Sequence, residues 1–304
     1  MIRAEHLAKR YGDTVAVDDL SFQIETGKVT GFLGPNGAGK STTMRLMLGL
    51  DRGVGATTYD GKALRDYRRP PQVVGMLLEA GAFHPTRTAR NHLRVLATAG
   101  AIPAARVDEA LDAVGLLHVS DRRPGKFSMG MSQRLGIAAA ILGEPKYLIL
   151  DEPANGLDPE GIFWLRQFLK GYAARGNAVF ISSHLLAELA QLVDDVVVIG
   201  RGKLIASTSM RELIASRSPG RVFARTAHER QFEDLLAQHA LVYERVGDDG
   251  FTIAGVTTDD ISRLAFEGRI PLLELTSRAG SLEGVFLELT EGAEEYRSGI
   301  NTKG

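Results

Sequence analysis

Cysteine is missing from all 304 positions of the chain. Its absence excludes disulfide-stapled scaffolds, thiolate metal sites and cysteine nucleophiles. Long apolar runs are missing as well. No uncharged apolar stretch approaches the roughly 18 residues of a membrane-spanning helix, and the charged first residues lack the apolar segment of a signal peptide. We therefore expect a cytoplasmic protein that does not cross a membrane by itself.

Neither sign of charge dominates, because 36 Lys and Arg stand against 37 Asp and Glu, a formal net charge of -1. This balance argues against a protein that binds nucleic acid through a broad basic surface. The charges are divided unevenly along the chain. Residues 216–304 carry 10 basic and 15 acidic groups, net -5, which leaves 26 and 22, net +4, for residues 1–215. We expect two domains with these bounds, the second an accessory domain.

Changes of periodicity predict an α/β organisation for the first domain. Residues 1–32 alternate as in an antiparallel hairpin or meander. Short apolar runs at 29–33, 147–150 and 178–181 are typical of strands that are buried on both faces of a parallel sheet. Residues 88–143 are rich in Ala and Leu at helical spacing, which predicts a helical block inserted into the α/β unit.

The second domain has a different order of predicted strands and helices. A loose Ser-rich stretch near 216–220 predicts a linker. The elements expected after it are a strand, a helix, two hairpin strands, a helix, a strand and a final helix, at residues 221–226, 230–238, 241–246, 251–256, 258–266, 271–276 and 281–291. This βαββαβ order followed by a helix suggests a small α+β module of ferredoxin-like type.

A phosphate-binding loop is predicted directly after the apolar run at 29–33. Gly34–Thr42 matches the pattern G-x-x-x-x-G-K-[ST] between a strand and a helix start. Inward-facing backbone N–H groups would hold phosphates, Lys40 would reach the β- and γ-phosphates, and the Ser41 hydroxyl would serve Mg²⁺. A flexible turn with a surface lysine is the alternative, which the flanking elements disfavour. The predicted nucleotide-binding set is Gly34, Pro35, Asn36, Gly37, Ala38, Gly39, Lys40, Ser41 and Thr42.

Two carboxylates end the strand predicted at 147–150. Asp151 suits Mg²⁺, directly or through water, and Glu152 can act as general base toward the water that attacks the γ-phosphoryl group. Taken alone, two acids at a strand end more often form a solvated loop, but the phosphate loop favours the catalytic interpretation. Ser182-Ser183-His184 ends the next strand, from which the imidazole of His184 could reach a γ-phosphate.

A second helix N-terminus suited to bind an anion lies in the sequence between the phosphate loop and Asp151. Ser128 and Gly130 open a helix there, and on these residues alone a simple N-cap is equally plausible. Together with the phosphate loop, the two carboxylates and His184, these residues give residues 1–215 a resemblance to the ATP-binding subunit of ABC transporters. Segments 34–42, 148–152, 128–134 and 155–158 are similar to the Walker A loop, Walker B strand, signature helix and D-loop, and His184 to the switch histidine.

The resemblance implies a P-loop NTPase fold of the ABC cassette type. It has an antiparallel β subdomain, a parallel-sheet core and a helical subdomain inserted at about 84–143. It also implies ATP and Mg²⁺ as cofactors, with Glu152 and His184 as catalytic residues. Tyr11 falls where the family places the aromatic ring that stacks on adenine; packing within the hairpin is the alternative. Ser128, Gly130 and Asp158 would contribute to ATP contacts in a head-to-tail homodimer.

Two departures from the family pattern bear on the transported compound. The signature LSGGQ is FSMGM here, so Met129 and Met131 replace a glycine and a glutamine. Glu79 stands where the family usually has the Gln of the Q-loop. We expect Glu79 to lie near nucleotide and Mg²⁺ and to report their occupancy to the membrane subunit, with an exposed acidic turn as the alternative. Glu79 and the segment 83–91 that follows it are similar to exporters of the bacitracin-resistance and lantibiotic-immunity types, and the ending 281–290 is similar to drug exporters of the daunorubicin type.

The function implied is an ATPase located peripherally on the inner face of the cell membrane, where it binds two MgATP and powers a separate integral membrane permease. The export of a peptide antibiotic, drug or lipid-like compound would confer antibiotic resistance. The alternative is a non-transport ABC protein acting on ribosomes or nucleic acid. Proteins of this kind either have two cassettes in one chain or carry a long coiled coil inserted within the cassette. This chain resembles a single cassette, with about ninety residues between the phosphate loop and the signature helix. A sensing module without turnover is disfavoured by Glu152 and His184.

Overall fold

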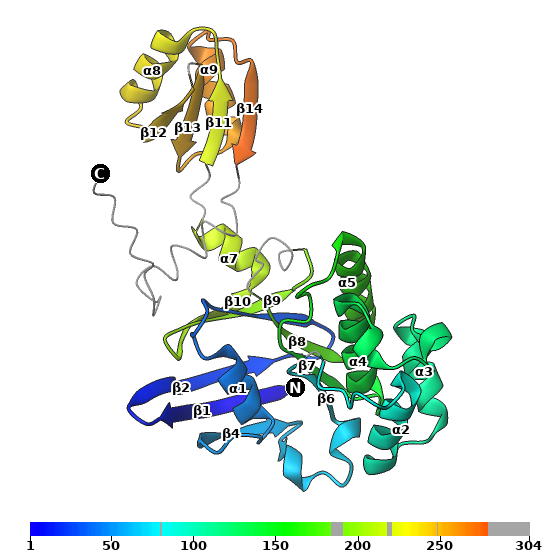
Figure 1. Ribbon diagram of the computed structural model, residues 1–304. Coiled ribbons are helices and arrows are strands. Elements are labelled where there is room, and N and C mark those ends of the chain that lie inside the picture. The colour runs from blue at the N-terminus through cyan, green and yellow to red at the C-terminus, as the bar shows by residue number, and fades with distance from the viewer. Residues whose placement is uncertain (80, 184–190, 218–220, 248, 279–304) are drawn as a thin grey trace, which may run out of the picture. The chain divides into compact units, whose positions relative to one another are not determined.

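The computed structural model describes residues 1–79, 81–183, 191–217, 221–247 and 249–278. These residues form two compact units, one of residues 1–209 and one that begins at Met210 (Figure 1). The boundary precedes helix α7 (Met210–Arg217), whereas the charge distribution placed it at 215/216. Residues 216 and 217 therefore belong to a helix rather than to the predicted linker, and 218–220 lie outside the described residues.

A six-stranded mixed sheet forms the core of the first unit, in the order β10-β9-β3-β8-β7-β6. Its strands are β3 (Val29–Leu33), β6 (Val74–Leu77), β7 (Tyr147–Leu150), β8 (Ala178–Ser182), β9 (Asp195–Gly200) and β10 (Lys203–Ser209). Every residue of β3, β7 and β8 is buried, as their continuous apolar runs predicted. The predicted parallel core is present in β9, β3, β8, β7 and β6, and one antiparallel strand is added at its edge, where the chain reverses at Gly202 (φ +77°) and β10 pairs with β9.

The predicted antiparallel hairpin forms a second sheet together with two further strands. Its order is β2-β1-β4-β5, from β1 (Ile2–Tyr11), β2 (Thr14–Ile24), β4 (Val54–Tyr59) and β5 (Lys62–Ala63). An aromatic cluster joins the two sheets. The rings of Phe22, Phe32 and Phe180 lie 4.9 to 5.8 Å apart between centroids, and all three side chains are buried. Burial of aromatic rings of this size contributes strongly to the stability of the sheet packing.

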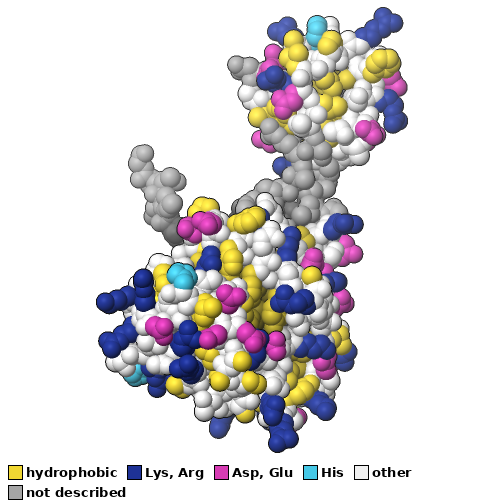
Figure 2. All heavy atoms as spheres, turned by 90° about the vertical axis from the view of Figure 1, so that its right-hand side faces the viewer, with side chains coloured by type: hydrophobic (Ala, Val, Ile, Leu, Met, Phe, Trp, Pro, Cys, Tyr) yellow, Lys and Arg dark blue, Asp and Glu magenta, His cyan; other side chains and the backbone are white. Residues whose placement is uncertain are grey.

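Helices supply the rest of the first unit. They are α1 (Lys40–Met47), α2 (Ala89–Ala99), α3 (Ala105–Ala113), α4 (Met129–Ile141) and α5 (Pro159–Ala174), with 3-10 turns at Leu64–Asp66, Pro70–Gln72, Leu117–Val119 and Pro124–Lys126. Figure 1 shows α2, α3 and α4 grouped beside α5, and these three helices fall within the stretch predicted as a helical insertion. Among the helices of the described ranges, none has both the length and the hydropathy to cross a bilayer. On the face drawn in Figure 2, basic and acidic side chains are interspersed, in keeping with the balanced charge.

The second unit contains a four-stranded antiparallel sheet in the order β12-β13-β11-β14. Its elements follow one another as β11 (Arg221–Arg225), α8 (Glu229–Gln238), β12 (Tyr243–Val246), β13 (Gly250–Ala254), α9 (Thr258–Glu267) and β14 (Glu274–Arg278). Phe232 of α8 and Ile261 of α9 pack with Phe251 and Ile253 of the sheet in one apolar core. The element order agrees with the predicted βαββαβ pattern, and the final helix predicted at 281–291 lies outside the described residues.

A carboxylate between β4 and β5 ties the antiparallel sheet to the mixed one. Asp60 accepts hydrogen bonds from Lys146 Nζ at 2.7 Å and from Tyr147 Oη at 2.6 Å. Partial burial alone would raise the pKa of Asp60, but hydrogen bonds from Lys146, the Met1 amino group and Tyr147 outweigh it and hold this pKa well below its usual range. Such a carboxylate stabilises the folded state above its unfolded pKa of about 3.9, and this stabilisation is lost as the pH falls toward the lower folded value.

Replacing Asp60 with asparagine should lower the free energy of unfolding at pH 7. The loss should be no more than about 1 kcal/mol, because the side chain is 43% exposed and solvent screens its ion pair. The difference from the unaltered chain should shrink as the pH is lowered to about 3. Urea unfolding at both pH values measures it, with Asp66→Asn, an exposed carboxylate 3.8 Å from Arg65, as control. If the two chains differed equally in unfolding free energy at both pH values, the lowered pKa of Asp60 would be contradicted.

Candidate nucleotide site

The loop 34–39 curls between buried β3 and the start of α1. Gly39 has a φ of +98°, and a Cβ there would lie 2.3 Å from the carbonyl oxygen of Ala16. A Cβ on Gly34 would lie 2.7 Å from the carbonyl oxygen of Ile199. Both positions therefore require glycine, because the loop backbone approaches neighbouring backbone too closely for any side chain.

Lys40, the first residue of α1, is held across this loop. Its side chain is almost fully buried, and its Nζ donates hydrogen bonds to the carbonyl oxygens of Gly34 at 2.7 Å and Pro35 at 3.2 Å. Burial lowers the pKa of Lys40, while the nearby charges of Glu152 and Asp151 act in the opposite direction and favour the ammonium form. The ammonium group is thus positioned between the loop and two carboxylates.

The loop opens onto a cavity of about 290 Å³. Its lining residues are Ala16, Asn36, Gly37, Ala38, Gly39, Lys40, Ser41, Thr42, Asp151 and Glu152. The structure therefore brings most of the predicted phosphate loop together with the two strand-end carboxylates. A cation, a helix start and backbone N–H groups suit phosphate oxygens. The hydroxyl of Ser41 and the carboxylate of Asp151 are hard oxygen donors, the kind that Mg²⁺ takes beside phosphates, so the residues present fit MgATP.

One buried hydroxyl links the Asp151 carboxylate and the backbone of Glu152 to the next strand. Ser182 Oγ donates to Asp151 Oδ1 at 2.5 Å and accepts from the backbone N–H of Glu152 at 2.8 Å. The contact depends on the parallel register of β7 and β8, in which Leu150 lies beside Ile181. Glu152 has a φ of +48°, an uncommon conformation for a residue other than glycine. Its backbone turns out of the sheet immediately after Asp151 and is held there by Ser182.

The other predicted residues of the first 80 positions do not line this cavity. Tyr11 is half exposed at the end of β1, and its Oη donates to Asp51 Oδ2 at 3.0 Å. Asp51 is in turn paired with Arg45 of α1 at 3.0 Å, and Lys9 Nζ lies 4.8 Å from the centre of the Tyr11 ring. These contacts fix the ring in place. Glu79 is exposed just beyond β6.

Two predicted residues begin helices elsewhere in the unit. Ser128 caps α4, where its Oγ accepts from the N–H of Met131 at 3.2 Å, and Asp158 caps α5, where its Oδ1 accepts from the N–H of Gly161 at 2.8 Å. Neither they nor Gly130 line the cavity of their own chain. The predicted catalytic residue His184 lies outside the described residues.

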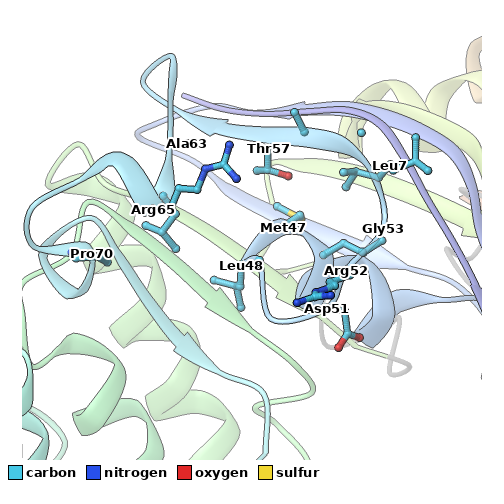
Figure 3. A pocket seen from close by; sticks show the side chains of 16 residues that line it. Leu7, Met47, Leu48, Asp51, Arg52, Gly53, Thr57, Ala63, Arg65 and Pro70 are labelled. Atoms are coloured by element: carbon cyan, nitrogen blue, oxygen red, sulfur yellow. The ribbon is translucent and has the colours of Figure 1, made fainter.

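A larger cavity of about 740 Å³ lies elsewhere in the first unit, between β4, the end of α1 and the turns at 64–72 (Figure 3). Apolar side chains such as Leu48 form much of its lining, and its Thr57 Oγ1 has no hydrogen-bond partner. Arg65 on its rim is exposed to solvent. None of the predicted site residues lines it. The smaller cavity is the better nucleotide site, because a buried cation and loop N–H groups converge only on that one of the two.

Three residues contribute to the site without having been predicted from the sequence. Ser182 was noted only as part of a strand end, and Ala16 was not singled out. The third is Gly202, whose N–H donates to the carbonyl of Ala38 at 3.0 Å and whose carbonyl accepts from the N–H of Asp18 at 2.9 Å. A glycine between two strands was the only available signal, because these contacts join positions far apart in the sequence.

A glycine loop with a buried lysine at a helix start, facing two carboxylates on a parallel strand, defines a P-loop nucleotide-binding protein. The family profile described as ABC transporter matches residues 17–155. A domain of unknown function (DUF8746) matches residues 220–283.

Known proteins agree with this class. The chain is 36% identical over 301 residues to the bacitracin transport ATP-binding protein BcrA of Bacillus licheniformis, covering 96% of this chain and 98% of that one. It is 36% identical over 208 residues to the lantibiotic transport ATP-binding protein SrtF of Streptococcus pyogenes, covering 67% and 89%. The ATP-binding cassette MJ0796, solved as a dimer bound to ADP and Pi, shares the fold, with a TM-score of 0.62, 22% identity and coverage of 69% and 99%. The chain therefore belongs to the ATP-binding subunits of ABC transporters, as its motifs indicated, and is an ATPase.

Proposed function

We propose that this ATPase subunit powers the export of a peptide antibiotic or drug through a separate integral membrane permease. The observation that carries the proposal is the similarity to the bacitracin transport protein, which extends over nearly the whole chain, including the second unit. We propose a location on the inner face of the cell membrane, since the permease would supply the membrane-spanning part. Export of the compound would give the cell resistance or immunity to it.

The roles proposed for the site residues follow from the cavity. Lys40 and the loop N–H groups hold the phosphates, while Ser41 and Asp151 would hold Mg²⁺. When bound, the ion neutralises charge on the phosphate oxygens. Glu152 acts as general base toward the attacking water, and the hydrogen bond that its backbone N–H donates to Ser182 Oγ keeps it beside the cavity. We assign His184 a second catalytic role at the γ-phosphate.

We further propose that two copies assemble head to tail around two ATP molecules. Ser128, Gly130 and Asp158 line no part of the cavity in their own chain. We therefore propose that these residues contact the ATP molecule that is held in the cavity of the second copy. Tyr11, anchored through Asp51, offers its ring to the adenine.

The permease is proposed to dock on the part of the first unit that includes Glu79 and the helical insertion. Figure 2 shows hydrophobic side chains gathered in the middle of one face of this unit. Met76, Val95 and Leu96 are each more than a third exposed. Exposed apolar groups of this kind suit a protein interface. Glu79 would report nucleotide and metal occupancy to the permease by swinging toward or away from the site.

For the second unit we propose a ferredoxin-like accessory domain, with the functional division at 215/216. Numbered along the chain from β11, its four strands lie in the order 2-3-1-4 with two helices in the intervening connections. This order supports the ferredoxin-like assignment. All proposed phosphate contacts precede residue 185, so this domain would be dispensable for ATP binding.

Purification of the tagged chain from native membranes in mild detergent should bring down a membrane protein with several spanning segments. Vesicles that contain this complex should move bacitracin or a lantibiotic in an ATP-dependent manner. The Lys40→Ala chain should still co-purify with the permease, because the proposed docking residues are unchanged, but should move no compound. Recovery of ribosomes or nucleic acid in place of a membrane protein would contradict export and favour the non-transport alternative.

A further inference from the structure

The first turn of α4 packs against the loop 155–158 of the same chain, just before α5. Met129 is 63% exposed overall, but its side chain covers Gly156 so closely that a Cβ on Gly156 would overlap the Met129 sulfur. One residue further on, Gly130 lies against Leu157, whose Cδ2 would be 3.4 Å from a Cβ built on that glycine. Two consecutive residues of the signature helix thus contact two consecutive residues of the loop.

A buried amide makes the third contact. Gln133 is 4% exposed, and its Nε2 donates to the carbonyl oxygen of Asn155 at 3.2 Å. Its Oε1 is buried without a hydrogen-bond partner, an arrangement that by itself costs stability. Since Gln133 lies one helical turn after Met129, both side chains reach the loop from the same face of α4.

We propose that Met129 and Gln133 clasp the loop 155–158 to α4 and so act as positioning residues for the shared ATP site. Ser128 and Asp158 lie at the two ends of the clasped region, and both are backbone-capping residues with fixed side-chain orientation. The clasp holds these two groups at a constant spacing, so that they reach the partner's ATP together. A misplacement of about 1 Å at such a site can lower turnover about a hundredfold. This inference rests on the proposed dimer for its ATP contacts but not for the clasp itself.

Exchange of backbone amide hydrogen in the ATP-free protein tests the clasp directly. Met129→Ala keeps a good helix former at the first position of α4 but removes the cover from Gly156, so the amides of 155–157 should exchange about tenfold faster. Met129→Leu should restore the protection, and Met131→Ala serves as the matched control with unchanged exchange. Unchanged exchange in Met129→Ala would overturn the clasp.

Gln133→Leu separates positioning from stability. The substitution removes both the donor to Asn155 and the unpartnered acceptor, so the unfolding midpoint should not fall, while exchange at 155–157 should rise. The kcat for ATP should drop about tenfold with little change in KM, because the chain's own phosphate loop is intact. A normal kcat with faster exchange would overturn the positioning role.

A double-mutant cycle with Gly156→Ala gives an independent readout. The added methyl group must displace Met129, so Gly156→Ala should lose activity, and adding Met129→Ala should recover the part due to this collision. Losses that simply multiply would contradict the contact. If the unaltered chain forms no ATP-dependent dimer, the proposed dimer fails, whereas the exchange measurements still decide the clasp.

Discussion

Replacing Lys40 with alanine is expected to abolish ATP turnover and to weaken ATP binding at least about a hundredfold. The ammonium is the one cation that lines the phosphate cavity in the described part of the chain, and it lies between the loop and the two carboxylates. Each hydrogen bond from an ammonium to a phosphate is worth roughly 1.5 to 3 kcal/mol, and two of them account for the expected loss in affinity. Equilibrium binding of ATP and steady-state release of phosphate measure the two effects.

Lys40 also stabilises the loop itself, since it donates to the carbonyls of Gly34 and Pro35, so a folding control is needed. Lys40→Met keeps the apolar stem of the side chain and removes only the charge. It should retain the unfolding midpoint more closely than Lys40→Ala and still fail to bind. Lys62→Ala, an exposed lysine of β5, should behave as the unaltered chain. ATP hydrolysis at the normal rate in Lys40→Met would refute the phosphate-binding role.

Replacing Glu152 with glutamine should reduce kcat by about 10² to 10⁴, the range that a positioned general base supplies. Glutamine keeps the shape and hydrogen bonding, and the backbone bond to Ser182 does not depend on the side chain, so ATP affinity should stay close to normal. Because the bound ATP is not consumed, the variant should accumulate as an ATP-bound dimer. Single-turnover hydrolysis and size-exclusion chromatography with MgATP provide the measurements.

Glu160→Gln is the matched control, since Glu160 is an exposed residue in the first turn of α5. It should hydrolyse ATP at the normal rate and should not accumulate as a dimer. Two results would count against the assignment of Glu152. One is hydrolysis within tenfold of normal, and the other is a Glu152→Gln chain that remains monomeric with saturating MgATP.

Much of the fold could be predicted because its strongest signals are local. Strands β3, β7 and β8 are buried throughout and mostly apolar, with Thr30 and Ser182 as their polar residues, so their sequences alone mark them as central strands. The phosphate loop is a contiguous motif for the same reason. In contrast, β10 is an edge strand with mixed polarity and only partial burial, which left no clear period of two. Its pairing with β9 became visible only in three dimensions.

The candidate site shows the same division between local and long-range information. Asp151 and Glu152 were found because they directly follow a buried strand. The contact with Ser182 arises from strand register, and the bond from Tyr11 to Asp51 joins positions 40 residues apart. A single sequence carries no record of such register or spacing, since each depends on how separate elements pack. The clasp of Gln133 on Asn155 escaped prediction for that reason.

The single hydroxyl of Ser182 bonds both the Asp151 carboxylate and the backbone N–H of Glu152. A substitution at Ser182 should therefore disturb two groups at once, the carboxylate proposed to hold Mg²⁺ and the backbone that directs the proposed general base. On these roles, rate and metal affinity are linked traits at Ser182. A change confined to the Glu152 side chain leaves the shared hydroxyl in place and should alter the rate alone.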